Sequence, residues 1–276
     1  MLLALALVFG TALLIVGGLW LHPRWRDARR ARVRARPFPP AWRSILRRRV
    51  PAYRRLPADL QRQLREHLLV FLDEKPFIGC AGQRIDDEVR VTIAAQACLL
   101  LLNRPAHYFS RLRQVLVYPG PFVVQRVHAD GSGVLHDQRR ALAGESWQQG
   151  QVILSWQDVV EGAAVPDDGR NVVLHEFAHQ LDQETGIANG APHLPSRERH
   201  ERWSRVMSDA FVRLRWQLDA GLHADSLGDY AAQNPAEFFA VATELFFERA
   251  DWLADTHAAL FDELRAYYAV DPRHWH

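Results

Sequence analysis

Residues 171–183 constrain the fold more than any other segment, because an apolar helical pattern there encloses three groups that need polar partners. The apolar residues are Val172, Val173, Leu174, Phe177, Ala178 and Leu181, and they surround His175, Glu176 and His179. Positions i and i+4 of a helix lie on one face, so the two imidazoles point the same way. A helix this apolar is buried, and its polar groups must find partners inside the protein. The segment therefore predicts a buried helix whose histidines share one partner.

The shared partner that this spacing favours is a zinc ion. His-Glu-x-x-His on a helix presents two imidazoles to one cation, with the glutamate beside them. Zinc held by two histidines and a carboxylate keeps a position for water, whose pKa the metal lowers towards about 7. We expect His175 and His179 to bind the metal and Glu176 to act as the general base. In the alternative, the three are ordinary surface or half-buried helix residues, which the apolar surroundings disfavour.

The third metal ligand is left open by spacing alone. The histidine of the longer HExxHxxGxxH pattern would fall on Thr185, so that pattern is excluded. A glutamate from a later helix remains, and Glu237, Glu244 and Glu248 are separated by seven and four residues. All three lie on roughly one helical face, so spacing does not choose among them.

Asp182 follows the two histidines and lies nearly on their face, one turn beyond His179. Its carboxylate could orient a ligand histidine from behind. Equally, an Asp in the last turn of a helix can simply bond to the local backbone. Both interpretations stay open.

The order of sequence patterns predicts an α+β domain over residues 55–276. Helical spacing covers about 56–73 and 87–102, β-branched runs lie between 114 and 156, and helical patterns return over 171–183, 197–220 and 235–269. Helices, then a small sheet, then helices are typical of an α+β fold and not of an alternating parallel sheet. We also expect the strand Val152 to Trp156 to be an exposed edge to which a substrate backbone adds.

The amino-terminal segment predicts a membrane anchor. Residues 1–21 carry no charge and are long enough as a helix to cross about 30 Å of hydrocarbon. We expect a transmembrane helix over 1–22. A cleaved signal peptide is disfavoured because no basic residue precedes the apolar run.

Charge is distributed unevenly along the chain. Residues 22–65 hold fifteen arginines and two acidic residues, a net charge of about +13, whereas residues 66–276 carry about −11. We interpret 23–54 as an arginine-rich linker that contacts anionic membrane surfaces and keeps the following domain in the cytoplasm, at the inner membrane. A cytoplasmic protein is the alternative location. The acidic body argues against nucleic acid as a partner, and Cys80 and Cys98, without CxxC spacing, are expected to be reduced thiols.

Several separated segments resemble the Mlc titration factor A family of zinc peptidases. They are residues 92–99, 117–119, 146–150, 175–182 and 234–237. The resemblance implies a zincin-like metallopeptidase domain, similar in its core to anthrax lethal factor and of the gluzincin type. It implies Glu237 as the third ligand of one Zn²⁺, with Glu244 supporting the site. It also implies Tyr230 as a donor to the developing oxyanion and His136 as a resting-state metal ligand.

The function expected from the residues and the resemblance is hydrolysis of peptide bonds by metal-activated water, in a membrane-anchored regulatory peptidase acting on a peptide or protein substrate. An alternative, suggested by the family's name, is a membrane-tethered binding protein that sequesters a transcription repressor in glucose phosphotransferase regulation. Hydrolysis of a non-peptide bond is a third possibility, because the motif says little about the scissile group.

Overall fold

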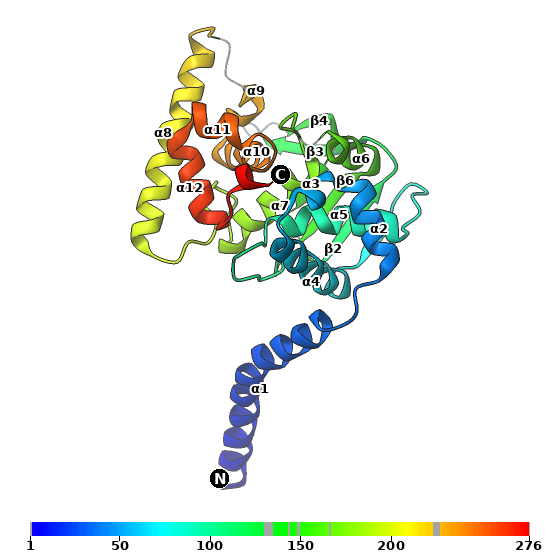
Figure 1. Ribbon diagram of the computed structural model, residues 1–276. Helices are drawn as coiled ribbons and strands as arrows, with labels where there is room; N and C mark the ends of the chain where they lie inside the picture. Colours follow the sequence, from blue (N-terminus) through cyan, green and yellow to red (C-terminus); the bar gives the residue numbers. More distant parts are fainter. Residues whose placement is uncertain are drawn as a thin grey trace.

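The computed structural model describes residues 2–129, 135–142, 144–147, 150–165, 167–222 and 227–275. Side chains are described throughout these ranges, except for most of residues 2–20 and all of 122–147. Helices dominate the described chain (Figure 1). They are α1 (Leu2–Arg34), α2 (Pro40–Arg49), α3 (Pro51–Arg55), α4 (Ala58–Glu74), α5 (Asp87–Leu99), α6 (Trp156–Ala164), α7 (Val172–Asp182), α8 (Arg197–Asp219), α9 (Gly228–Ala231), α10 (Pro235–Glu248), α11 (Ala250–Thr256) and α12 (Ala258–Tyr268), with short 3-10 turns at Gln183–Thr185 and Pro272–His274.

The described strands form two separate sheets. They are β1 (Phe77–Gly79), β2 (Gln114–Tyr118), β3 (Phe122–Ala129), β4 (Leu135–Leu142), β5 (Gly144–Trp147) and β6 (Gln151–Ser155). The larger sheet has the order β1-β2-β6-β5, with β1, β2 and β6 parallel and β5 antiparallel to β6. Strands β3 and β4 pair only with each other in the described chain. Because β6 is hydrogen-bonded on both sides, the prediction that Val152 to Trp156 forms an exposed edge is wrong, and β5 is the edge strand there.

The predicted fold class, an α+β domain preceded by a transmembrane helix, is also wrong. The chain is mostly helical, and the sheet is not the single block expected between 114 and 156. Its first strand, Phe77–Gly79, precedes α5, and α5 lies on the connection to β2 that makes these two strands parallel. Three residues are too few to show alternation in the sequence, so this strand and the parallel pairing were not predictable from periodicity.

The amino-terminal helix differs from the predicted anchor. α1 runs from Leu2 through Pro23 to Arg34 without interruption, so the apolar run and the arginines after it belong to one helix. Within the described part of the chain, no helix combines the length and the apolar character that crossing a membrane requires. The predicted transmembrane helix over 1–22 and the single-pass inner-membrane location are therefore wrong.

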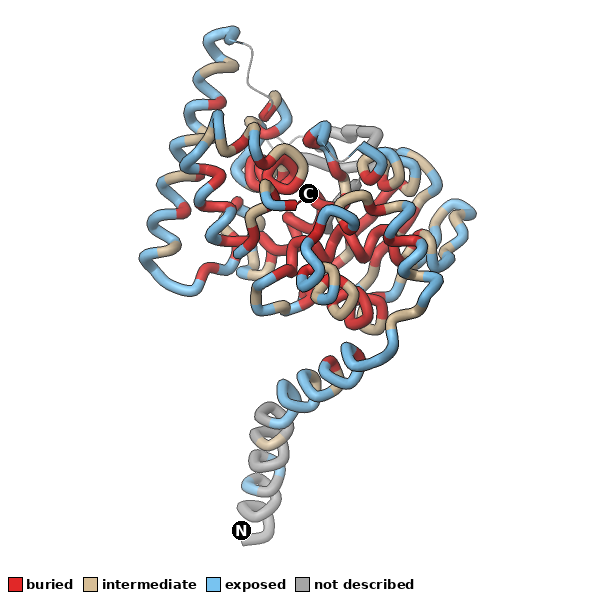
Figure 2. The backbone as a smooth tube through the Cα atoms, in the orientation of Figure 1, coloured by how far each residue is buried: buried red, intermediate tan, exposed pale blue. Residues whose placement is uncertain are grey.

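The end of α1 packs against α4 (Figures 1 and 2). The guanidinium of Arg30, almost fully buried, donates to both carboxylate oxygens of Glu74 at 2.7 and 2.8 Å. Arg29 and Arg36 both donate to the carboxylate of Asp73, at 2.6 and 3.1 Å. Part of the segment expected to be a linker is thus ion-paired to the globular body, and contact of its other arginines with anionic membranes stays a prediction.

An aromatic cluster fixes α7 against α4. The ring of Phe177, on the inner face of α7, lies 4.8 Å from the ring of Phe109 and 5.7 Å from that of Phe71, centroid to centroid. All three side chains are buried. Aromatic pairs at such distances add roughly 0.5–1.5 kcal/mol each beyond burial. The face of α7 opposite the histidines is therefore held in a rigid apolar core.

A buried histidine beside this cluster predicts acid sensitivity. Burial, and then the charge of Arg34, lower the pKa of His67 to about 4, and its Nδ1 lies 2.9 Å from the hydroxyl oxygen of Tyr108. Between pH 6.5 and pH 4 the unfolded chain binds a proton there that the folded chain does not, so stability falls as pH falls. We expect His67 to account for a loss of about 2 kcal/mol between pH 7 and pH 5.

Urea unfolding of the wild type and of His67→Gln at both pH values measures this contribution. The glutamine variant should lose less stability on acidification, by about the same 2 kcal/mol. Equal losses in the two proteins would show that His67 is not the responsible group. The exposed His200, replaced by Gln, serves as the matched control and should not alter the pH dependence.

Candidate metal centre

Helix α7 carries the two histidines in a geometry set by its first turn. The side chain of Asn171 caps the helix, because its Oδ1 accepts hydrogen bonds from the backbone N–H groups of Val173 and Leu174, both at 3.1 Å. His175 follows one turn later and His179 two turns later on the same face, and their ring centroids lie 4.9 Å apart. Each is only 8% exposed. The two imidazole rings thus lie close together on one face of α7, almost fully buried.

Helix α10 brings a carboxylate to the same place. Its first turn is fixed by Pro235 at the start and by the cap Asn234, whose side chain accepts from the N–H groups of Ala236 and Glu237. Glu237 Oε2 lies 3.0 Å from His175 Nε2 and 3.3 Å from His179 Nε2. One ligand atom from each of the three residues falls within 4.8 Å of the other two. Two imidazoles and a carboxylate around one point are a donor set typical of zinc.

The three glutamates that spacing could not separate have different positions in the structure. Only Glu237 faces the Nε2 atoms of both histidines. Glu244 lies behind His175, with Oε1 2.7 Å from Nδ1 of that ring and Oε2 accepting from the N–H of Asn171 at 2.6 Å. Glu248 lies farther along α10 and accepts from the side-chain amide of Asn171 at 2.9 Å.

The charges fit a cation at this point. Burial alone would favour neutral His175, but the carboxylates of Glu244 and Glu237 outweigh it and raise the pKa of this histidine well above its usual value. Burial likewise opposes ionisation of Glu237, yet the hydrogen bonds from His175 and His179 hold its pKa far below the usual range. Because a carboxylate only accepts, Nδ1 of His175 carries the proton that faces Glu244. A divalent cation would replace the second proton, on Nε2, and the residues therefore fit the metal.

Glu176 and Tyr230 both lie near His175. Glu176 follows His175 on α7 and is 5% exposed, and its charge is among those that raise the pKa of His175. Tyr230 is on α9, is 45% exposed, and its ring centroid lies 5.7 Å from that of His175. The structure thus brings both predicted catalytic residues next to the predicted ligands.

His136 is the predicted site residue that the structure does not place beside the others. Its backbone lies in β4, paired with His128 of β3. Its side chain falls outside the described residues, so its position relative to the metal ligands is not defined. The role of His136 as a resting-state ligand stays a prediction.

Comparison with known proteins identifies the family. A family model described as glucose-regulated metallo-peptidase M90 matches residues 24–269. The chain belongs to this M90 family. It is 39% identical over 268 residues to the Synechocystis sp. protein named Uncharacterized protein slr2042, covering 97% of each chain. It is 35% and 34% identical over 225 residues to the Mlc titration factor A proteins of Enterobacter sp. (strain 638) and Escherichia fergusonii, covering 81% of this chain and 84% of each relative.

Membership of the M90 family supports a metallopeptidase-type protein and, with it, a metal at the centre formed by His175, His179 and Glu237. The resemblance to the Mlc titration factor A family, noted from five segments of sequence, is confirmed by these comparisons. The role of each residue in the centre stays a prediction, because it follows from position and chemistry alone.

Two residues that shape this M90 site were not found from the sequence. Asn171 caps α7 and also bonds to Gln96, Glu244 and Glu248. Its position directly before the apolar helix is the signal that could have identified it, since Asn is a favoured cap. Gly190 lies in the segment between α7 and α8. Its N–H donates to Asp182 Oδ2 at 2.8 Å, so the hydrogen bond described for Asp182 goes to backbone and not to a ligand histidine.

Gly190 couples the metal helix to the helix that carries Glu237, and its replacement should loosen the site. It adopts a φ of +77°, and a Cβ there would lie 2.4 Å from the carbonyl oxygen of Pro235. Gly190→Ala must therefore displace the first turn of α10. We expect a loss of about 1–3 kcal/mol in the free energy of unfolding and at least about tenfold weaker zinc binding, measured by urea unfolding and by competition with a chromogenic chelator.

Gly221→Ala is the matched control for that variant. Gly221 also has a positive φ, +67°, but a Cβ there would meet nothing within 4 Å. Gly221→Ala should lower the free energy of unfolding by about 1 kcal/mol from backbone strain alone. It should bind zinc as the wild type does. Equal zinc affinities of the two variants would contradict the coupling through Pro235.

Proposed function

We propose that this M90 chain is a zinc-dependent peptidase of the gluzincin type, with His175, His179 and Glu237 as metal ligands. The observation that carries the proposal is the convergence of His175 Nε2, His179 Nε2 and Glu237 Oε2 beside the buried Glu176. Family membership supports metallopeptidase chemistry independently of this geometry. Bound zinc would supply a Lewis acid for the substrate carbonyl and a water of lowered pKa.

The residues around the metal take the proton-transfer and orienting roles. Glu176 removes a proton from the attacking water and delivers it to the leaving amine. Glu244 accepts the Nδ1 proton of His175 and so fixes which ring nitrogen is free to bind the metal. Tyr230 donates a hydrogen bond to the oxygen that becomes negatively charged in the tetrahedral intermediate.

The substrate backbone is proposed to pair with β5. This strand is the edge of the larger sheet next to β6, and it contacts α7. An edge strand offers unpaired N–H and C=O groups to an extended peptide. A peptide or protein substrate would then lie along the face of α7 that bears the histidines.

Metal removal tests the peptidase proposal. Dialysis against a chelator should abolish cleavage of a fluorogenic peptide library, and one equivalent of Zn²⁺ should restore it, whereas Mg²⁺ should not, because an imidazole-rich site favours zinc. Mass spectrometry of the library products would define the cleavage preference. Undiminished cleavage by the chelator-treated protein would exclude metal-dependent hydrolysis.

Repressor binding is a second proposed function, favoured by the name Mlc titration factor A of the relatives. Binding needs a complementary surface, whereas hydrolysis needs the base Glu176. A pull-down with purified Mlc from Enterobacter therefore separates the two functions. Glu176→Gln should retain any such binding, and failure of the wild type to bind Mlc would remove the proposal for this chain.

A further inference from the structure

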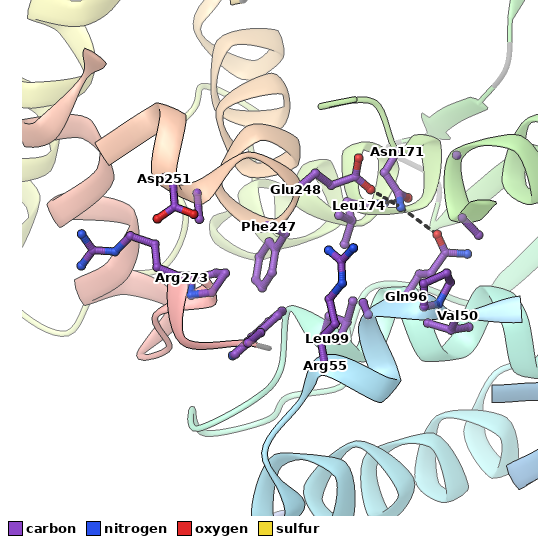
Figure 3. Close-up of a pocket in the computed structure, with 17 residues that line it drawn as sticks. Val50, Arg55, Gln96, Leu99, Asn171, Leu174, Phe247, Glu248, Asp251 and Arg273 are labelled. Carbon is purple, nitrogen blue, oxygen red and sulfur yellow. Dashed lines mark hydrogen bonds between the residues drawn. The ribbon is translucent and has the colours of Figure 1, made fainter. Parts of the chain in front are cut away.

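A pocket of about 150 Å³ lies at the amino-terminal end of the metal helix, lined there by Asn171 and Leu174. Its walls come from α3, α5, α6, the starts of α7 and α11, the end of α10 and the carboxyl-terminal residues (Figure 3). None of the proposed metal ligands lines it. The described apolar walls include Leu99, Leu174, Phe247 and Trp275, all buried. A cavity of this volume holds one benzene-sized molecule.

The pocket has one cation available for a ligand. Of the lining residues, all of which the structure describes, Arg55 and Arg273 carry the positive charges. Arg273 is engaged with the carboxylate of Asp271, at 2.6 Å. Arg55 forms no hydrogen bond or ion pair within the described chain, and Figure 3 shows its guanidinium directed towards Leu174. Guanidinium groups bind carboxylates through two parallel hydrogen bonds.

The acidic residues that line the pocket do not neutralise the positive charge of Arg55. Burial, and to a lesser extent the charges of Asp168 and Glu244, raise the pKa of Glu248 to about 9 against the hydrogen bond from Asn171, so this side chain is neutral at pH 7. Asp251 is exposed at the mouth, on the side of Arg273 (Figure 3). The interior thus combines apolar walls with the neutral polar side chains of Gln96, Asn171 and Glu248, and Arg55 lies at its entrance.

Asn171 connects this pocket to the metal centre. Its side-chain amide donates to Gln96 at 2.8 Å and to Glu248 at 2.9 Å, and all three residues line the pocket. Its backbone N–H donates to Glu244, which in turn holds Nδ1 of His175. A ligand that shifts Asn171 therefore changes both the start of α7 and the carboxylate that orients His175.

We propose that the pocket binds a small carboxylate with a single-ring or short aliphatic body, and that its occupancy is transmitted to His175 through Asn171 and Glu244. The ring lies against Leu174 and Phe247, and the carboxylate pairs with Arg55. Such a ligand would regulate the metal site without competing with the substrate, because none of the proposed metal ligands lines the pocket. The binding itself does not depend on the proposed peptidase function.

Benzoate is the probe, and benzyl alcohol is its neutral counterpart of similar shape. Calorimetry and saturation-transfer NMR on the full chain should show saturable benzoate binding at millimolar concentrations, with benzyl alcohol at least about tenfold weaker. Arg55→Gln should weaken benzoate binding at least about tenfold. The matched control, Arg54→Gln on the same helix, should bind within about twofold of the wild type, because Arg54 does not line the pocket.

Ala52→Phe fills the entrance from α3 and should abolish binding, with circular dichroism used to verify its fold. No saturable benzoate binding by the wild type, or equal affinities of the Arg54 and Arg55 variants, would overturn the site. These binding outcomes require neither zinc nor a substrate, so they are distinguishable from failure of the peptidase proposal.

The coupling is tested by measuring benzoate affinity with and without one equivalent of Zn²⁺. Linkage requires zinc to change benzoate affinity by the same factor by which benzoate changes zinc affinity. We expect a change of at least about fivefold in both measurements, the size of a modest allosteric coupling. Identical benzoate affinities in the two forms would overturn the transmission to His175.

Discussion

Replacing Glu176 with glutamine is expected to lower peptide hydrolysis by about 10³-fold while zinc remains bound. The amide has nearly the size of the carboxylate, but it has no proton-accepting oxygen of comparable basicity, and general-base catalysis contributes about 10²–10⁴-fold. Glu176 is buried beside His175 and is not one of the three residues whose ligand atoms converge. The loss should therefore fall on kcat, with stoichiometric zinc found by atomic absorption.

Glu161→Gln is the control for this variant, because Glu161 lies exposed on α6 and contacts only Gln157 among the hydrogen bonds described. Its zinc content and its turnover should match those of the wild type. Wild-type turnover by Glu176→Gln would exclude this residue as the base. Loss of zinc from Glu176→Gln would instead mean that the substitution disturbs the ligands themselves.

The local pattern around the metal helix was predictable because it depends on neighbours in sequence. The spacing of His175 and His179, together with the apolar residues around them, predicted a buried helix with both rings on one face, and α7 confirms it. Helix α4 and helix α8 also follow the predicted ranges closely. In each case a period of 3.6 residues repeats over several turns, which is the strongest signal that a single sequence carries.

The features that the sequence predicted wrongly depend on contacts between distant segments. Nothing in Phe77–Gly79 marks it as a strand until β2 lies beside it. The edge strand is β5 and not β6, because β6 pairs with β5 on one side and with β2 on the other. The apolar composition of residues 1–21 predicted a membrane span, but composition does not show where a helix ends, and α1 continues to Arg34.

The third metal ligand could not be chosen from residue spacing and depends on the tertiary structure. Glu237, Glu244 and Glu248 lie on roughly one face of α10, but α10 packs against α7 so that only Glu237, in its first turn, reaches the Nε2 atoms of both histidines. Glu244, two turns later, reaches Nδ1 of His175, and Glu248, one turn after that, reaches the cap Asn171. One helical face thus supplies three different environments, which only the packing of two helices could distinguish.

Replacing Glu237, Glu244 and Glu248 of α10 one at a time with glutamine is expected to weaken zinc binding to three different extents, according to the environment of each side chain. Glu237→Gln should weaken zinc binding more than about 100-fold, because it removes the charged oxygen that both imidazoles face. Glu244→Gln should weaken zinc binding about 10–100-fold, the range typical of a group that orients a ligand histidine. Zinc affinity is measured by competition with a chromogenic chelator at pH 7.

Glu248→Gln serves as the matched control within the same helix. Because burial raises the pKa of Glu248 to about 9, its side chain is neutral at pH 7, and an amide replaces a neutral acid there with little electrostatic change. We expect zinc affinity within about threefold of the wild type. A loss at Glu244 as large as that at Glu237 would mean that both carboxylates bind the metal directly. An undiminished affinity in Glu237→Gln would exclude it as the third ligand, since no other change in the series removes a group lying against both Nε2 atoms.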